Sequence, residues 1–137
     1  LAEFFFNNLQ ANNQVFGFTD VFFCPLLANH IADIFLQMLE NQLAGLYHVV
    51  SQTASSKYKF GVEIANRFGL NAGLITPTSV SQADLKATRS PNLTLSNHKL
   101  MQSLNTPLPD LTKGLDRFFQ LYQEGFPNRI RSGAIYQ

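Results

Sequence analysis

The sequence predicts an α/β fold in one globular unit. The first observation is composition, because 45% of the 137 residues are apolar and 14% are charged, values typical of a folded domain. The second is that 13 Phe supply bulky side chains for a core, and a chain of this size buries roughly 65–70% of its unfolded surface. The third is the alternation of helix-periodic segments with short β-rich runs. Together these observations exclude an intrinsically disordered chain.

The first predicted elements are a helix over residues 2–11 and two short strands, over residues 14–18 and 21–23. Apolar residues at helical spacing indicate the helix, and two consecutive asparagines end it. Valine and phenylalanine dominate both strand segments. We therefore expect a turn at Thr19 and Asp20 between the strands.

The next two predicted elements are a helix over residues 29–41 and a strand over residues 46–50. Asn29 suits the N-cap of this helix, which carries one continuous apolar stripe. The run 46–50 is almost uninterrupted in apolar and β-favouring residues, which is typical of a strand covered on both faces. His48 lies within this run, so we expect it to be a core histidine whose hydrogen bonds are satisfied.

A further helix, a strand and a long loop follow. Ser55 or Ser56 can cap the helix, and Gly69 can end it in the left-handed conformation. Residues 73–76 offer another strand. Residues 78–95 are polar and show no periodicity, so we interpret them as a long loop of the kind that carries function.

The C-terminal third of the chain predicts two more helices. Ser96 suits the N-cap of a short helix that reaches about Leu104, and Asp110 can cap the final helix. Gly125 ends that helix, and residues 128–137 are predicted to form a C-terminal tail. The chain is therefore expected to contain about five helices and a few short strands.

Charge, hydropathy and cysteine content exclude several classes of protein. The net charge of +1, without a basic stripe, argues against a nucleic acid partner. No apolar run approaches the roughly 20 residues of a membrane-spanning helix, so no membrane partner is expected. Cys24 is the only cysteine, which rules out an internal disulfide and favours a cytoplasmic location. The three histidines are not spaced as metal ligands, and we predict no metal site.

The common catalytic and phosphate-binding motifs are missing from this sequence. It has no Gly-x-Ser-x-Gly elbow, no Gly-x-Gly turn and no Gly-Lys-Ser/Thr loop. Arg89 remains as a candidate, because a guanidinium held in a non-helical segment is a planar, bidentate donor suited to phosphate or carboxylate. The alternative is a solvated surface arginine, which the residues alone favour.

The stretch around Arg89 resembles extended short-chain dehydrogenases that act on nucleotide sugars, most closely the dTDP-4-dehydrorhamnose reductases. Those reductases carry the pattern Ala-Thr-Arg-Pro-x-Asn-Ser-x-Leu-x-x-x-Lys-Leu. The matching residues are Ala87, Thr88, Arg89, Asn92, Leu95, Lys99 and Leu100. Similar family patterns begin at Gly45, Ser56 and Pro107, so the likeness covers most of the chain.

The resemblance implies the C-terminal part of a Rossmann-like, NAD(P)-binding reductase of nucleotide-linked 4-keto sugars. Residues 1–127 would be the portion that binds the sugar nucleotide and would include late strands of the sheet. Arg89 is implied to face the diphosphate of the substrate, and Asn92 to shape the same loop. Thr19 and Phe22 are implied to lie beside the nucleotide end of the substrate.

The resemblance also implies that the catalytic residues lie outside this chain. The family's Gly-rich turn and Tyr-x-x-x-Lys pair have no counterpart here, so no catalytic and no cofactor-binding residue is expected. The N-terminal cofactor-binding half is expected to precede Leu1. NADP or NAD is expected to bind only to the longer protein of which this chain would be a part. The chain alone should then expose apolar surface and associate with the missing half or with itself.

Two other interpretations stay open. Many relatives have Arg-Asp where this chain has Thr19 and Asp20, and an Asp at the position of His30. These departures fit a non-catalytic subunit or regulatory relative that keeps the fold without the reaction. The remaining interpretation is an unrelated α/β binding domain whose likeness is accidental.

Overall fold

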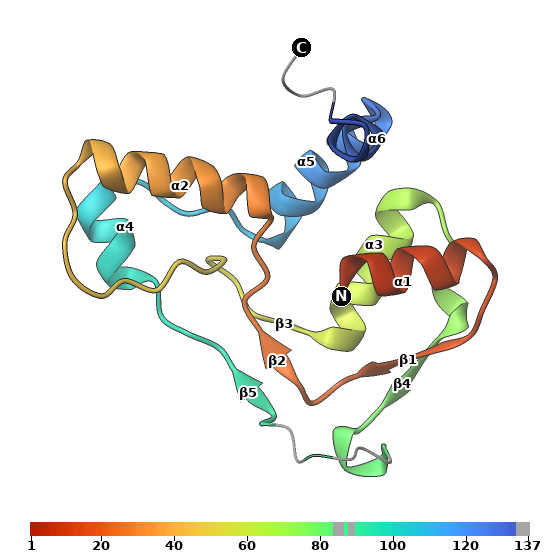
Figure 1. Ribbon diagram of the computed structural model, residues 1–137. Coiled ribbons are helices and arrows are strands. Elements are labelled where there is room, and N and C mark those ends of the chain that lie inside the picture. Colours follow the sequence, from red (N-terminus) through yellow and green to blue (C-terminus); the bar gives the residue numbers. More distant parts are fainter. Residues whose placement is uncertain (84–86, 88–89, 134–137) are drawn as a thin grey trace.

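Six helices and five short strands alternate along the residues that the structure describes, which confirms the α/β class (Figure 1). The structure is a computed structural model, and it describes residues 1–83, 87 and 90–133. None of the helices in this part of the chain combines the length and the apolarity that crossing a bilayer requires. The helices are α1 (Ala2–Gln10), α2 (Ala28–Glu40), α3 (Lys57–Phe68), α4 (His98–Leu104), α5 (Leu111–Gln123) and α6 (Phe126–Arg131). The strands are β1 (Val15–Phe18), β2 (Phe22–Phe23), β3 (Ser55–Ser56), β4 (Ile75–Thr78) and β5 (Asn92–Leu93).

The strands form two small sheets. β1 pairs in parallel with β4, so that Val15 lies opposite Ile75 and Phe18 opposite Thr78. β4 begins later than the sequence predicts, because the 3-10 turn Ala72–Leu74 comes before it. β2 lies between two other strands, antiparallel to β3 and parallel to β5. Ladders this short have little stability of their own and depend on the packing of the helices around them.

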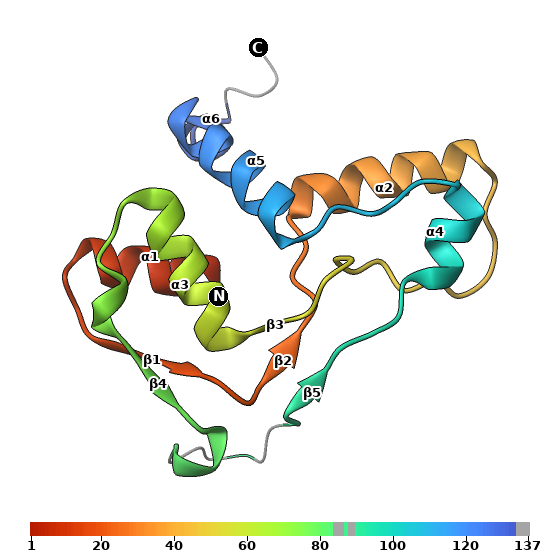
Figure 2. The same ribbon diagram turned by 180° about the vertical axis from the view of Figure 1, so that it is seen from behind.

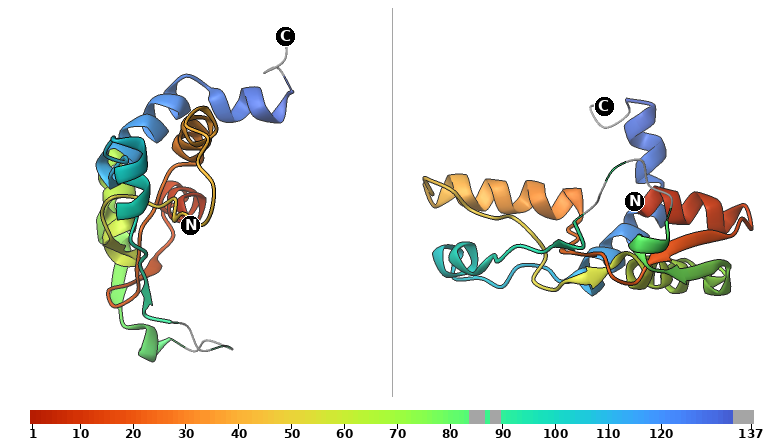
Figure 3. Two further views of the ribbon diagram at one scale, coloured as in Figure 1. Left: turned by 90° about the vertical axis from the view of Figure 1, so that its left-hand side faces the viewer. Right: turned by 90° about the horizontal axis from the view of Figure 1, so that it is seen from below.

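Two hydrophobic cores divide the fold into two lobes (Figures 1 and 3). The main lobe consists of α1, α3, α5, β1 and β4, and Phe5 and Ile64 lie at its centre. The α2–α4 lobe consists of α2, α4 and the segment of residues 43–49 that packs against them. Its buried side chains are Ile34, Leu100 and Leu108. The three-stranded sheet of β2, β3 and β5 lies between the two lobes (Figure 1).

Phenylalanine side chains hold the main lobe together. Phe5 of α1 is 1% exposed and packs on α3 at Gly61, where a Cβ atom would lie 2.6 Å from the ring. A second group of rings joins α1, α3 and α5 through edge-to-face contacts with centroids 4.9 to 5.4 Å apart. Its members are Phe6, Phe68, Phe118, Phe119 and Tyr122. The Phe-rich first helix is therefore a structural part of the core.

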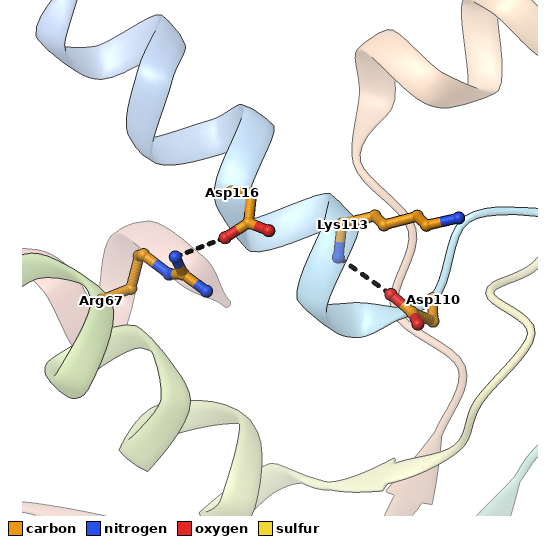
Figure 4. A network of polar contacts seen from close by, with 4 residues as sticks. All are labelled: Arg67, Asp110, Lys113 and Asp116. Carbon is orange, nitrogen blue, oxygen red and sulfur yellow. Dashed lines mark hydrogen bonds and ion pairs between the residues drawn. The ribbon is translucent and has the colours of Figure 1, made fainter.

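Side-chain caps fix the beginnings of α3 and α5, as the sequence predicts. The Ser56 hydroxyl accepts a hydrogen bond from the Lys59 N–H at 3.1 Å, and α3 ends at Gly69 in the left-handed conformation. The Asp110 carboxylate accepts from the Lys113 N–H at 2.9 Å (Figure 4). Each cap satisfies a backbone donor that the helix itself leaves unpaired.

Two ion pairs link α5 to other helices. Arg67 of α3 pairs with Asp116 of α5 (Figure 4), and Arg117 of α5 pairs with Asp33 of α2. Both pairs are partly exposed, so each contributes only about 0–1 kcal/mol. The second pair is a side-chain link between the main lobe and the α2–α4 lobe.

The prediction of a strand over residues 46–50 is wrong. The segment has no regular secondary structure, and His48, expected in the core, is exposed. Its Nδ1 atom lies 3.1 Å from the carbonyl oxygen of Ser96. A β-favouring run becomes a strand only when another strand bonds to it, and the described residues offer none at this place.

The helix boundaries differ from the prediction at three places. The N-cap of α2 is Leu27, so Asn29 lies inside the helix. The N-cap of α4 is Asn97 and not Ser96. The stretch predicted as a tail over residues 128–137 begins inside α6. Gly125, in the left-handed conformation, ends α5 and is the N-cap of α6, and Pro127 fits in the first turn of that helix.

Candidate substrate-binding site

Two of the four candidate site residues come together where β2 meets β5 (Figure 2). Phe22 and Asn92 are direct partners in this parallel ladder. The Phe22 N–H donates a hydrogen bond to the Pro91 carbonyl oxygen at 2.8 Å, which fixes the register. The ladder thus joins the segment after β1 to the end of the long polar loop.

Asn92 uses its side chain to shape the turn that leaves β5. Its Oδ1 atom accepts hydrogen bonds from the Thr94 N–H at 3.0 Å and from the Thr94 hydroxyl at 2.7 Å. The Ser90 hydroxyl donates to the Asn92 carbonyl oxygen at 3.0 Å. These contacts form a compact polar turn, the local geometry that asparagine favours.

The two residues of β2 face opposite sides of its sheet. Phe23 points inward, and its ring lies 5.4 Å from that of Phe60 in an edge-to-face contact. Phe22 therefore points outward, where it is 45% exposed. An exposed aromatic ring beside an asparagine offers a flat apolar surface to a planar ligand group.

Thr19 lies where β1 ends, and it extends the contact of β1 with β4. Its N–H donates to the Thr78 carbonyl oxygen at 3.0 Å, and its hydroxyl lies at 3.5 Å from the same oxygen. The Thr19 side chain is thereby directed back toward β4. Only two residues separate it from Phe22 in the sequence.

Asp20 is a residue of this region that sequence reasoning placed in a turn but did not select. Its carboxylate accepts hydrogen bonds from the Ser79 hydroxyl at 2.5 Å and from the Val80 N–H at 2.9 Å. The hydrogen bond from Ser79, followed by that from Val80, holds the pKa of the Asp20 carboxyl below its ordinary value. Asp20 thus ties the end of β1 to the beginning of the polar loop. Its partners are 59 and 60 residues away, so no local pattern could indicate this role.

Among the described residues, α3 places a cationic side chain near this region. Arg89 lies outside the described residues. Lys57, at the start of α3, places its Nζ atom 5.7 Å from the centroid of the Phe18 ring, and its N–H donates to the Val21 carbonyl oxygen at 3.0 Å. Lys57 is thus a cation close to the β1–β2 connection, and sequence reasoning did not select it.

An apolar cavity lies elsewhere, where α5 faces the start of α2. It measures about 230 Å³ and is lined by side chains such as Leu26, Phe60, Leu115 and Phe118. None of its lining residues is charged. This cavity therefore lacks the charged donors by which a diphosphate is usually bound.

The described residues contain no group of three His, Cys, Asp or Glu side chains placed to hold a metal ion. His30 of α2 is the titratable side chain with an unusual environment, because its Nδ1 atom is buried without a hydrogen-bond partner among the described residues. Burial lowers the pKa of His30, the nearby Arg117 lowers it further, and Asp33 partly opposes them.

Stability should therefore fall as the pH drops from about 6.5, the ordinary pKa of histidine. Because the pKa of His30 is lower in the folded chain than in the unfolded chain, the unfolded chain binds a proton more readily in this pH range. Acid therefore favours unfolding. We expect His30→Gln to flatten the dependence of the unfolding free energy on pH between about 7.5 and 5.5, as measured by urea denaturation. His98→Gln, at an exposed position, is the matched control. An unchanged pH dependence in His30→Gln would contradict this assignment.

Comparison with known proteins identifies the family. Residues 1–124 match the family model of the RmlD substrate binding domain. The chain belongs to this family. The resemblance to the substrate-binding part of dTDP-4-dehydrorhamnose reductases, indicated by the stretch around Arg89, is thereby confirmed.

Relatives of this RmlD substrate binding domain are longer proteins. The probable low-salt glycan biosynthesis reductase of Haloferax volcanii is 32% identical over 83 residues, which are 61% of this chain and 28% of that protein. The dTDP-4-dehydrorhamnose reductase of Clostridium acetobutylicum superposes with a TM-score of 0.80 at 18% identity, over 90% of this chain and 44% of its own. The dTDP-4-dehydrorhamnose reductase of Bacillus anthracis, solved in complex with NADP, superposes with a TM-score of 0.78 at 18% identity. That superposition covers 87% of this chain and 42% of the Bacillus anthracis chain. The chain thus spans less than half the length of these relatives, and the structural likeness shows a shared Rossmann-like fold.

The residues of this chain do not fit a nicotinamide cofactor. None of its eight glycines lies two residues from another, so the phosphate-binding turn is missing. The glycines with the closest neighbours, Gly17 and Gly61, face the protein atoms of Tyr58 and Phe5 instead of an open cradle. This RmlD substrate binding domain therefore offers no described site for NAD(P).

Proposed function

We propose that this chain is the substrate-binding portion of an NAD(P)H-dependent reductase that acts on nucleotide-linked 4-keto sugars. The observation that carries the proposal is the pairing of β2 with β5, which sets Phe22 beside Asn92. Arg89 precedes Asn92 by only three residues in the sequence, so it belongs to the stretch that leads into this ladder. Membership of the RmlD substrate binding domain family supports the same assignment.

The four candidate residues receive distinct roles in this proposal. Arg89 binds the diphosphate, because its planar guanidinium donates two parallel hydrogen bonds to phosphate oxygens. Asn92 keeps the loop in shape through Thr94. The exposed Phe22 ring lies against the planar base, and Thr19 borders the nucleotide end of the site.

The reaction itself belongs to the longer protein in this proposal. NADPH or NADH would supply the hydride when bound to the rest of that protein. The residues described here bind the nucleotide and orient the sugar, which is how a substrate-binding portion promotes a reaction carried out elsewhere in the molecule. The single cysteine, Cys24, suits the reducing cytoplasm that we propose as the location.

Replacing Arg89 by alanine is expected to weaken the binding of dTDP to the chain about 10- to 100-fold. The reason is that hydrogen bonds to charged groups contribute about 1.5–3 kcal/mol. Titration calorimetry or NMR with dTDP measures this effect. Arg131→Ala, which removes an exposed arginine from α6, is the matched control and should bind as the unmodified chain does. Equal affinity of Arg89→Ala and the unmodified chain would contradict the assigned role.

A chimeric enzyme separates the two functional alternatives. In it, this chain replaces the matched 42% of the Bacillus anthracis reductase. We expect the chimera to oxidise NADPH when a dTDP-linked 4-keto sugar is added. Binding of dTDP without NADPH oxidation would instead favour the non-catalytic relative that keeps the fold without the reaction.

A further inference from the structure

The connection between β1 and β2 contacts the polar loop near both of its ends. The Thr19 N–H extends the pairing of β1 with β4 by donating to the Thr78 carbonyl oxygen at 3.0 Å. Phe22, three residues later, pairs with Asn92 in β5. Figure 1 shows β4 beside β1 and β5 beside β2. One short segment, residues 19–22, therefore contacts the chain both where the loop begins and close to where it ends.

Asp20 lies in this segment and uses both oxygens of its carboxylate to anchor the beginning of the loop. One oxygen accepts a hydrogen bond from the Ser79 hydroxyl at 2.5 Å, and the other accepts from the Val80 N–H at 2.9 Å. The Ser79 Oγ atom also accepts from the Ser81 N–H at 3.2 Å, at the start of the 3-10 turn Val80–Gln82. Because hydrogen bonds to a carboxylate are stronger than those between neutral groups, this one side chain fixes the first turn after β4.

These contacts favour a positioning role for Asp20 over direct contact with a ligand. Both carboxylate oxygens already face protein donors, and a negative charge would repel the diphosphate of a sugar nucleotide. The hydrogen bond from Ser79, followed by that from Val80, keeps the pKa of the Asp20 carboxyl below its ordinary value. The carboxylate is therefore ionised, and able to accept both hydrogen bonds, throughout the neutral pH range.

We propose that Asp20 is a positioning residue of the nucleotide site, which fixes the beginning of the polar loop through Ser79 and Val80 while the ladder between β2 and β5 fixes its end. The inference rests on the proposed function, because Arg89 lies in the sequence between these two anchors. A segment restrained at both ends has less conformational freedom to lose when a ligand binds. Asp20 thus raises the affinity for the nucleotide without contacting it.

Asp20→Ala tests this inference in the full chain. We expect the variant to bind dTDP about tenfold more weakly than the unmodified chain, because the loop loses one of its two anchors. Ser79→Ala should weaken binding in the same way, whereas Ser79→Thr keeps the hydroxyl and should bind as the unmodified chain does. Titration calorimetry or NMR with dTDP measures these affinities. Equal affinity of Asp20→Ala and the unmodified chain would contradict the inference.

Asp110→Ala is the matched control for a purely structural effect. The Asp110 carboxylate also accepts a backbone N–H at 2.9 Å, at the start of α5. Loss of this cap should lower the unfolding free energy, as measured by urea denaturation, but leave the affinity for dTDP unchanged. An equal loss of affinity in Asp20→Ala and Asp110→Ala would mean that Asp20 acts only through general stability, and the inference would fail.

A double variant separates an action through the loop from an independent effect on the ligand. Because Asp20 is proposed to position the loop that contains Arg89, Asp20→Ala should weaken binding by less than about twofold in the Arg89→Ala background. NMR titration with dTDP measures the weak affinities of these variants. Fully additive losses of affinity would argue against a positioning role.

Amide hydrogen exchange gives a readout that does not depend on dTDP. We expect the amides of Val80 and Ser81 to exchange at least about tenfold faster in Asp20→Ala, while amides in the middle of α3 exchange as in the unmodified chain. Unchanged exchange at Val80 and Ser81 would overturn the inference even where dTDP binds. Failure of the unmodified chain to bind dTDP would instead contradict the proposed function, and the exchange rates would still decide whether Asp20 anchors the loop.

Discussion

Gly17→Ala is expected to destabilise the chain by about 2–3 kcal/mol, because β1 lies too close to α3 to admit a methyl group. A Cβ atom at position 17 would lie 2.8 Å from the Tyr58 Cα atom and 3.1 Å from the Ile75 side chain. The first neighbour is backbone, so relief requires the strand and the helix to move apart. Urea denaturation followed by circular dichroism measures the loss of unfolding free energy.

Gly114→Ala provides the matched control for Gly17→Ala. A Cβ atom at position 114, within α5, has no neighbour within 4 Å. Alanine is a better helix former than glycine, so this variant should gain roughly 0.5–1 kcal/mol. Equal stability of the two variants would contradict the close approach of β1 and α3. Because Thr19 and Asp20 follow β1, Gly17→Ala should also weaken the binding of dTDP.

Phe5→Ala is expected to cost about 3–5 kcal/mol, the largest effect of a single truncation in the main lobe. The ring is 1% exposed and fills the space between α1 and α3. Gly61→Ala should destabilise the chain for the opposite reason, since its Cβ atom would lie 2.6 Å from that ring. Overpacking of this kind costs about 1–3 kcal/mol.

The double variant distinguishes packing from a general weakness of the lobe. In the Phe5→Ala background, Gly61→Ala has room for its methyl group and gains helix propensity, so it should be neutral or stabilising by up to about 1 kcal/mol. Denaturation of the four proteins in this cycle gives the coupling free energy. Purely additive losses would mean that the Phe5 ring and position 61 do not share one space.

Local signals in the sequence predicted most of the helices correctly. Ser56 and Asp110 are N-caps whose donors lie three residues ahead, and Gly69 adopts the left-handed conformation that ends α3. These features depend on neighbours within one helical turn, so a single sequence contains what is needed to find them. The cap at Asn29 failed because the helix begins slightly earlier, at a position without a side-chain cap.

Features that depend on distant partners were harder to predict. Residues 46–50 have the composition of a buried strand, but a strand also requires a neighbour, and the described chain supplies none. The contact of Asp20 with Ser79 joins two turns across 59 residues. In the candidate site, the resemblance was enough to select Phe22 and Asn92. That these two residues are partners in one ladder became visible only in the fold.

The ladder between β2 and β5 has a consequence for how the protein folds. Its partners Phe22 and Asn92 stand about seventy residues apart, and each strand has only two residues. Closing a loop of that length costs roughly 4 kcal/mol of chain entropy. The few backbone hydrogen bonds of this ladder contribute less stabilisation than that. The ladder therefore forms only after the helices have collapsed around their cores. The proposed nucleotide-binding surface around Phe22 and Asn92 is accordingly a late product of folding, and its assembly depends on the residues of the two hydrophobic cores.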